Sequence, residues 1–252
     1  MGRLSVLEKQ SIHSLSLWIR FFYFRSMAMM KTIPDKILKR LFKLFYKPFL
    51  EKYLSGERNY RYQSLRLKIF PGVFHPRFFF STKILLGYLE RYELQNQSFL
   101  ELGAGSGLIA LSAAKKGAAV TATDISRRAM ENISVNKQLN NVILEGIHSD
   151  LFDSIPQQIF DFIVINPPYY KGIIRTEADH AWYAGEHLDY FQKLFRQLPA
   201  YMNDRTHAFV ILSDECDIGG IQSLAAANQL AFRLVFSKKV FWETNFIYEI
   251  HF

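Results

Sequence analysis

The sequence predicts an α/β fold with a doubly wound, mostly parallel sheet of seven strands. Short apolar runs alternate with helical patterns from about residue 95 onward, which is typical of such a sheet. Glycine and acidic residues follow several of these runs. The last two runs are joined by a short connection, which indicates an antiparallel strand at the end. With 252 residues, 49% of them hydrophobic, the chain can bury one large core.

Each element has its own signal in the sequence. Strands are expected at residues 98–102, 119–123, 142–147, 160–165, 208–212, 231–236 and 246–250, and helices at 108–116, 126–140, 186–202 and 215–229. The run at 160–165 is almost entirely apolar, so it is expected to be buried on both faces of the sheet. Ser126 is a helix cap and Gly117 ends a helix. Residues 60–70 alternate like a hairpin that leads into Pro71 and Gly72.

Charge divides the chain into two predicted parts, residues 1–60 and 61–252. The first part holds 12 Lys and Arg against 4 Asp and Glu, whereas the second holds 19 of each. Apolar residues from Ile37 to Phe45 recur at helical spacing. We therefore expect a small, basic, mainly helical N-terminal extension. Its charge suits an acidic partner such as RNA, the ribosome or a membrane surface, and it equally suits a solvated helical face.

The location of the protein is predicted from its apolar stretches and its cysteine. The apolar stretch at 15–30 carries Arg20 and Arg25 and is shorter than the roughly 20 apolar residues of a membrane-spanning helix. We predict no membrane span and no export signal. The single cysteine, Cys216, excludes an internal disulfide and suits a reducing compartment. We expect a cytoplasmic monomer.

A glycine-rich loop separates the strand at 98–102 from the helix that follows. Gly103, Gly105 and Gly107 allow a tight turn and close approach of a ligand to the backbone. Their spacing is Gly-x-Gly-x-Gly rather than the Gly-x-Gly-x-x-Gly of nicotinamide-dependent dehydrogenases, which argues against that class. Glu101 lies just before the loop and suits a cationic or amino-acid-bearing ligand better than a pyrophosphate.

Two further acids follow the next two strands. Asp124 ends the second strand, where a carboxylate can accept both hydroxyls of a ribose, and Asp150 follows the third, where it can meet an adenine amino group. Either acid alone could be a helix cap or a surface charge. Together with Glu101 they lie at the carboxyl ends of consecutive strands, which form the ligand crevice of open α/β sheets.

Directly after the fourth strand lies the sequence Asn166, Pro167, Pro168 and Tyr169. The prolines keep the backbone rigid and leave carbonyl oxygens to accept hydrogen bonds. The Asn166 side-chain oxygen and the Tyr169 ring add an acceptor and a stacking face. This set suits a planar NH2 group, whose nitrogen needs orientation toward an electrophilic carbon. A purely structural turn is the alternative.

These residues resemble the class I methyltransferases that use S-adenosylmethionine (AdoMet), over roughly residues 70–252. The resemblance implies a Rossmann-like fold and AdoMet as the cofactor. No metal is expected, because the histidines and the single cysteine lack the spacing of metal ligands. It places Glu101 and the three glycines at the amino-acid end of AdoMet, Asp124 at the ribose and Asp150 near the adenine. Asn166 is expected to contact both cofactor and substrate.

The Asn-Pro-Pro-Tyr motif is similar to that of enzymes that methylate glutamine amides, adenine N6 or guanine N2. Pro76 and Arg77, followed by Ser81 and Thr82, resemble a segment of the HemK-type release-factor glutamine methyltransferases, although the acidic residues of that segment are missing. Residues 181–186 resemble a second segment of that group, with one of its two glycines kept; their aromatic residues, Trp182 and Tyr183, are equally consistent with a place in the core.

We therefore predict methylation of a protein glutamine side chain, with a release factor or ribosomal protein as the partner. A tRNA or rRNA base, methylated at adenine N6 or guanine N2, is the main alternative, and a small molecule is another. The non-enzymatic alternative is an RNA- or ribosome-binding protein on a methyltransferase fold.

Overall fold

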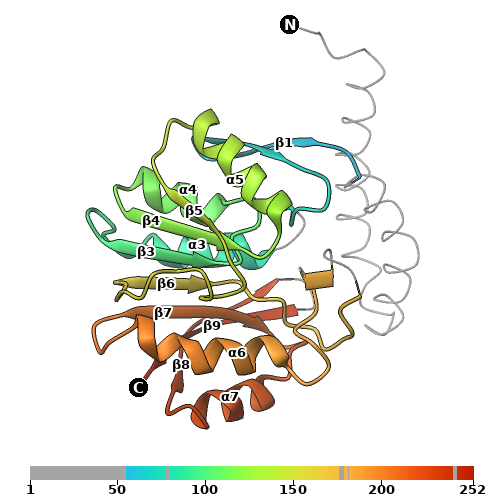
Figure 1. The fold of residues 1–252 in the computed structure, drawn as a ribbon, viewed down its shortest axis with the longest axis vertical. Helices are drawn as coiled ribbons and strands as arrows, with labels where there is room; N and C mark the ends of the chain where they lie inside the picture. The colour runs from blue at the N-terminus through green and yellow to red at the C-terminus, as the bar shows by residue number, and fades with distance from the viewer. Residues whose placement is uncertain (1–54, 78–79, 176–178, 181, 241–242) are drawn as a thin grey trace, which may run out of the picture. The chain divides into compact units, whose positions relative to one another are not determined.

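The computed structural model describes residues 55–77, 80–175, 179–180, 182–240 and 243–252. Its centre is a seven-stranded sheet with the order β5-β4-β3-β6-β7-β9-β8 (Figure 1). Strands β3 to β7 pair in parallel, and β9 runs antiparallel to both of its neighbours. The predicted doubly wound sheet of seven strands is confirmed, and the antiparallel strand lies between β7 and β8 rather than at the sheet edge.

The elements have the following bounds. The strands of the large sheet are β3 (Ser98–Leu102), β4 (Ala119–Asp124), β5 (Glu145–His148), β6 (Phe162–Ile165), β7 (His207–Ser213), β8 (Ala231–Val240) and β9 (Glu243–His251). The helices are α3 (Phe80–Leu89), α4 (Leu108–Lys115), α5 (Arg127–Leu139), α6 (Asp189–Gln197), α7 (Ile218–Ala226) and the 3-10 helix η2 (Leu198–Tyr201). A separate hairpin consists of β1 (Arg58–Tyr62) and β2 (Leu65–Ile69).

Two hydrophobic cores cover the two faces of the sheet. In β6, Phe162 and Val164 pack into the core that α3 and α4 complete, while Ile163 and Ile165 pack into the core of α6 and α7. Both faces of this strand are therefore buried, which explains its continuous apolar sequence. The result is a three-layer arrangement with helices on both sides of the sheet.

Several predicted boundaries were wrong. The helix expected at 186–202 starts only at Asp189, because Leu188 has a left-handed backbone (φ 60°), and it gives way to η2, where Pro199 lies in the first turn. The strand expected at 142–147 is Glu145–His148. Helix α3 was not predicted: seven of its ten residues are buried, so it shows no polar face from which a helical period could be recognised.

Three asparagines, two in α5 and one at its C-cap, hold the β1–β2 hairpin. The side-chain oxygens of Asn132, Asn136 and Asn140 accept backbone N–H groups at alternate positions, those of Phe70 just after β2 and of Lys68 and Arg66 within it. Four residues along a helix advance about 6 Å and two residues along a strand about 6.6 Å. The spacing of the asparagines therefore matches the spacing of the backbone N–H groups that they accept. Asn136 also donates to the carbonyl of Ser106 in the glycine-rich loop. The hairpin is thus fixed to the loop through α5.

The predicted N-terminal extension lies almost entirely outside the described residues, as does the helix expected between Ile37 and Phe45. The predicted boundary at residue 60 falls inside β1. Within the described part of the chain, no helix has both the length and the apolar character needed to cross a bilayer. The cytoplasmic location and the monomeric state stay predictions.

Candidate functional site

A cavity of about 520 Å³ opens at the carboxyl ends of the central strands. From the neighbouring strands β3 and β6 the sheet continues in opposite directions, toward β5 and toward β8, so the cavity lies at the topological switch point. The predicted residues that line it are Glu101, Gly103, Gly105, Asp124, Asp150, Asn166, Pro167, Pro168 and Tyr169. Gly107 is not among the lining residues and forms the N-cap of α4.

The glycine-rich loop forms the floor of one end. Gly103 and Gly105 have φ values of 69° and 53°, a region that glycine adopts without strain. The N–H of Ala104, between them, donates to the carbonyl of Thr123 at 2.8 Å, which ties the loop to β4. The loop therefore turns sharply from β3 into α4 with its backbone against the cavity.

Glu101 lies in β3 beneath this loop and is 4% exposed. Its Oε2 accepts the N–H of Ala110, in the first turn of α4, at 2.7 Å. Burial raises the pKa of Glu101 to about 8; the bond from Ala110 opposes this, and the nearby Asp124 charge adds to it. A cation brought to this end of the cavity would favour the ionised carboxylate.

Asp124 is held at the cavity wall by the backbone. Its Oδ2 accepts the N–H of Gly105 at 2.8 Å, and its Oδ1 accepts the N–H of Ser126 at 2.9 Å. The first bond comes from the glycine-rich loop and the second from the N-cap residue of α5. Both carboxylate oxygens are therefore oriented by backbone N–H groups.

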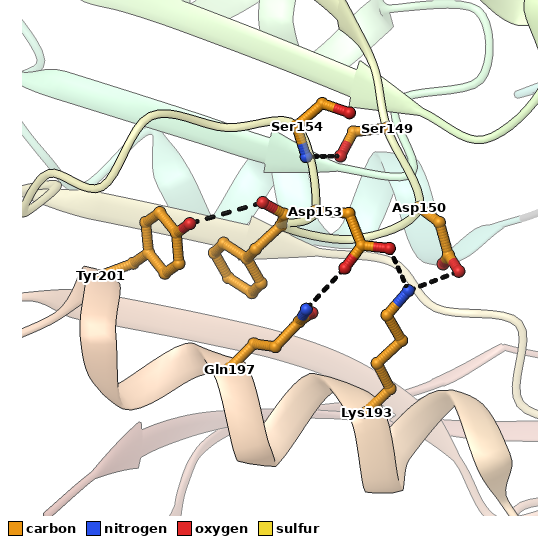
Figure 2. Close-up of polar contacts among 8 residues, drawn as sticks. Ser149, Asp150, Asp153, Ser154, Lys193, Gln197 and Tyr201 are labelled. Atoms are coloured by element: carbon orange, nitrogen blue, oxygen red, sulfur yellow. Dashed lines mark hydrogen bonds and ion pairs between the residues drawn. The ribbon is translucent and has the colours of Figure 1, made fainter.

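Asp150 lies at a different part of the cavity wall and is held by a side chain. Lys193, from α6, extends between Asp150 and Asp153 (Figure 2), with its Nζ 2.5 Å and 2.6 Å from their Oδ2 atoms. Burial alone would lower the pKa of Lys193, but the two carboxylates outweigh it and raise the pKa above its usual value. The Lys193 bond to Asp153 is the main cause that lowers the pKa of that carboxyl.

Asn166 follows β6 directly and faces the cavity beside the loop. Its Nδ2 donates to the hydroxyl of Thr82 in α3 at 3.2 Å, which fixes the amide plane and leaves Oδ1 as its acceptor atom. Pro167 is buried and has no N–H to donate. Thr82 also lines the cavity. The role of Thr82 in orienting Asn166 could not be derived from the motif itself.

Aromatic side chains form much of the remaining wall. Tyr169 is largely buried, which raises its hydroxyl pKa well above the usual range and keeps it neutral, and its ring centroid is 4.9 Å from that of Tyr170. Phe74 and Trp182 face each other with centroids 5.9 Å apart. The sequence was equally consistent with a place in the core or in the pocket for Trp182 and Tyr183. In the structure both residues line the cavity.

Some lining residues were not singled out for the cavity from sequence. Among them are Phe74, His180, Tyr190 and Lys193, together with Thr82 as a contact of Asn166. Tyr190 and Lys193 lie three residues apart on the amphipathic helix α6, which is the only signal that could have placed both on one face.

Comparison with known proteins identifies the domain that carries this cavity. Residues 64–184 match the family model "Methyltransferase small domain". This part of the chain is a methyltransferase domain. The family match confirms a methyltransferase domain over these residues, and the order of the sheet confirms the predicted Rossmann-like, doubly wound fold.

Curated relatives agree with this assignment. The chain is 31% identical over 181 residues to the release factor glutamine methyltransferase of Lactococcus lactis, covering 67% of this chain and 66% of the relative. It is 37% identical over 108 residues to a putative protein N5-glutamine methyltransferase of Methanocaldococcus jannaschii, covering 42% of this chain and 52% of the relative. The chain thus spans about half to two thirds of the length of these two relatives.

Solved structures share the fold at low sequence identity. The 16S rRNA N2 G1207 methyltransferase of T. thermophilus, solved with AdoMet and guanosine, superposes with a TM-score of 0.57 at 21% identity, over 77% of this chain and 50% of that one. The Mtq2–Trm112 complex of E. cuniculi gives 0.55 at 21% identity, over 71% and 98%. AdoMet, the cofactor predicted here, is named in the first of these structures.

Proposed function

We propose that this protein transfers the methyl group of AdoMet to the side-chain amide of a glutamine in a protein. The observation that carries the proposal is the position of Asn166: its amide is oriented by Thr82, and Asn166 and Pro167 line the same cavity as the three carboxylates. The glutamine methyltransferase names of the relatives support the choice of acceptor.

The residues around the cavity fit AdoMet along its length. Glu101 is a buried acid at the glycine-rich loop and suits the cofactor's ammonium group. Asp124 is fixed by two backbone N–H groups and suits the ribose hydroxyls, and Asp150 suits the adenine amino group. When bound, the cofactor supplies an electrophilic methyl group on a sulfonium.

The chain's own residues would position the acceptor. Asn166 Oδ1 and the Pro167 carbonyl accept the two N–H bonds of a planar amide, and the Tyr169 ring packs on its face. These contacts hold the nitrogen with its lone pair toward the cofactor, which is the proximity effect that speeds group transfer. A strong general base is not needed, because the nitrogen becomes acidic as it gains the methyl group and releases its proton to water.

A nucleic-acid base is the second candidate acceptor. The aromatic side chains of Phe74, Trp182 and Tyr169 offer stacking faces that a flat base can use as well as an amide. The solved rRNA guanine methyltransferase with the same fold is consistent with this alternative. The proposed partners are accordingly a release factor or ribosomal protein first, and tRNA or rRNA second.

One experiment separates these acceptors. A lysate from cells that lack this protein is incubated with labelled AdoMet and the purified full-length chain, and the label is followed into protein and RNA fractions. Label in protein, located on glutamine by mass spectrometry, supports the proposal. Label in RNA supports the second candidate. No label, together with salt-sensitive RNA binding, would favour the non-enzymatic RNA-binding protein.

Asn166→Ala tests the assigned role. We expect calorimetry to show AdoMet affinity within about threefold of the wild type, and methyl transfer to fall by about 10²–10³, because one oriented hydrogen-bonding group is lost from the reacting centre. Asn228→Ala is the matched control, since Asn228 bonds only the local carbonyl of Leu224 at the end of α7. Full activity in Asn166→Ala would refute the role.

A further inference from the structure

Three polar side chains from one helical face fasten the loop that carries Asp150. Lys193, Gln197 and Tyr201 are spaced by four residues along α6 and η2. Lys193 bonds Asp150 and Asp153, and Gln197 donates to Asp153 at 2.7 Å (Figure 2). The Tyr201 hydroxyl bonds the carbonyls of Ile155 at 2.9 Å and Phe152 at 3.4 Å. We call residues 149–155 the Asp150 loop and these three residues its clasp.

The Asp150 loop has its own internal structure. The N–H of Ser154 donates to Ser149 Oγ at 3.0 Å, and Leu151 adopts a left-handed backbone (φ 53°). Phe152 is buried and stacks on Tyr201 with centroids 4.3 Å apart. The backbone of the loop is therefore fixed independently of Lys193, so loss of that lysine should not unfold it.

The Asp150 side chain is in a different situation. It is 48% exposed, and Asp153 is 49% exposed, whereas Lys193 is only 24% exposed between them. A half-exposed carboxylate is free to choose among rotamers, and a neighbouring carboxylate repels it. The ammonium of Lys193 removes that repulsion and selects one orientation of Asp150.

Lys193 differs from the other two clasp residues in one respect. It lines the cavity together with Asp150, whereas Gln197 and Tyr201 are not among the lining residues: Gln197 bonds Asp153, and Tyr201 bonds backbone carbonyls and stacks on Phe152. Gln197 holds Asp153 from the far side, so Asp153 in turn anchors the lysine. The chain of contacts runs from α6 through Lys193 to the carboxylate at the cavity wall.

We propose that Lys193 is a positioning residue that orients Asp150 toward the adenine edge of the cofactor and so sets the selectivity for a 6-amino purine. The proposal rests on the proposed function. The Asp150 side chain, held as a hydrogen-bond acceptor, matches the N–H donors of the adenine amino group and repels the 6-oxo oxygen of hypoxanthine. Without Lys193 the carboxylate turns toward water. Both the affinity for the cofactor and the discrimination between 6-amino and 6-oxo purines then decline.

The test is calorimetry on the full-length protein with two ligands, S-adenosylhomocysteine and its 6-oxo analogue S-inosylhomocysteine. The wild type should bind the adenosine compound more tightly. Lys193→Met should lower the affinity for the adenosine compound by about tenfold, which corresponds to one charge-assisted hydrogen bond. It should lower the affinity for the inosine compound much less. Lys193→Arg should recover most of the loss. Gln197→Met is the matched control, because it also removes a bond to Asp153 but leaves Asp150 and Lys193 paired; it should bind both ligands as the wild type does.

Two further readouts separate positioning from a general structural role. The methyl-transfer rate at saturating AdoMet should stay within about twofold in Lys193→Met while the KM for AdoMet rises about tenfold. In a double-mutant cycle with Asp150→Asn, the two losses should be strongly non-additive.

Three results would overturn the inference. They are an equal loss of affinity for both ligands in Lys193→Met, an unchanged affinity for S-adenosylhomocysteine in that variant, and additive losses of affinity in the double-mutant cycle. If the wild type binds neither nucleoside compound, the proposed function itself fails, which is a distinct result.

Discussion

Asp124 and Asp150 line the same cavity and are fixed in opposite ways. Asp124 is held by two backbone N–H groups, that of Gly105 in the glycine-rich loop and that of Ser126 directly after its own strand. Asp150 is held by a lysine 43 positions further along the chain. Backbone donors cannot turn away, whereas a lysine side chain can, so the first carboxylate is rigid and the second is adjustable. The two regions therefore respond differently to mutation, pH and salt.

The largest difference is expected from alanine at each site. Asp124→Ala should lower the affinity for S-adenosylhomocysteine by about 100-fold or more. It should also lower the unfolding free energy by about 2 kcal/mol, because it removes the acceptor of two backbone N–H groups. Asp150→Ala should weaken the ligand by only about tenfold with little change in stability, since no backbone donor loses its acceptor. Calorimetry and thermal unfolding measure both. Equal effects of the two variants on stability would contradict the comparison.

A pH effect of intermediate size is expected at the glycine-loop end. Because burial raises the pKa of Glu101 to about 8, the group contributes stability below its unfolded pKa and loses that contribution as pH rises toward 8. Binding of a cationic cofactor favours the ionised form, so the affinity for AdoMet should rise by up to about tenfold per pH unit until about pH 8 and then level off.

Glu101→Gln is the control for this effect. Its stability should fall less than that of the wild type between about pH 5 and pH 8, and its AdoMet affinity should change little over the same range. Calorimetry in buffers of different ionisation enthalpy should detect proton release from the wild type alone. Proton release of the same size in Glu101→Gln would assign the titration to another group.

The smallest effect is the salt dependence of the Asp150 end. The Lys193 ion pairs are partly exposed, so added salt screens them, whereas the backbone bonds of Asp124 are insensitive to it. Raising NaCl should weaken S-adenosylhomocysteine binding by about twofold in the wild type and less in Lys193→Met. A steeper slope in Lys193→Met would mean that the salt acts elsewhere.

The same distinction explains what could be predicted from sequence. Glu101, Gly103, Asp124 and Asn166 are placed by a strand and the turn after it, so their positions on the cavity follow from the parallel sheet alone. The central strand at β6 was evident from its apolar run. These signals are local, and the structure brings all four residues to one cavity.

The residues that were missed depend on contacts between distant segments. Thr82 meets Asn166 across 84 positions, and Lys193 meets Asp150 across 43. No pattern along the chain reports such a pair. Helix α3 was missed for a related reason: its buried surface is set by the sheet and helices around it, which removes the polar face that a helical period requires.

The three asparagines of α5 and its C-cap affect the tendency of the protein to aggregate. Strand β2 has β1 on one side, and on the other its N–H groups at alternate positions are taken by Asn132, Asn136 and Asn140. An exposed strand edge can pair with strands of other molecules and so start aggregation. Here the side-chain amides of a helix occupy that edge, so this side of β2 is closed to such pairing without a further strand.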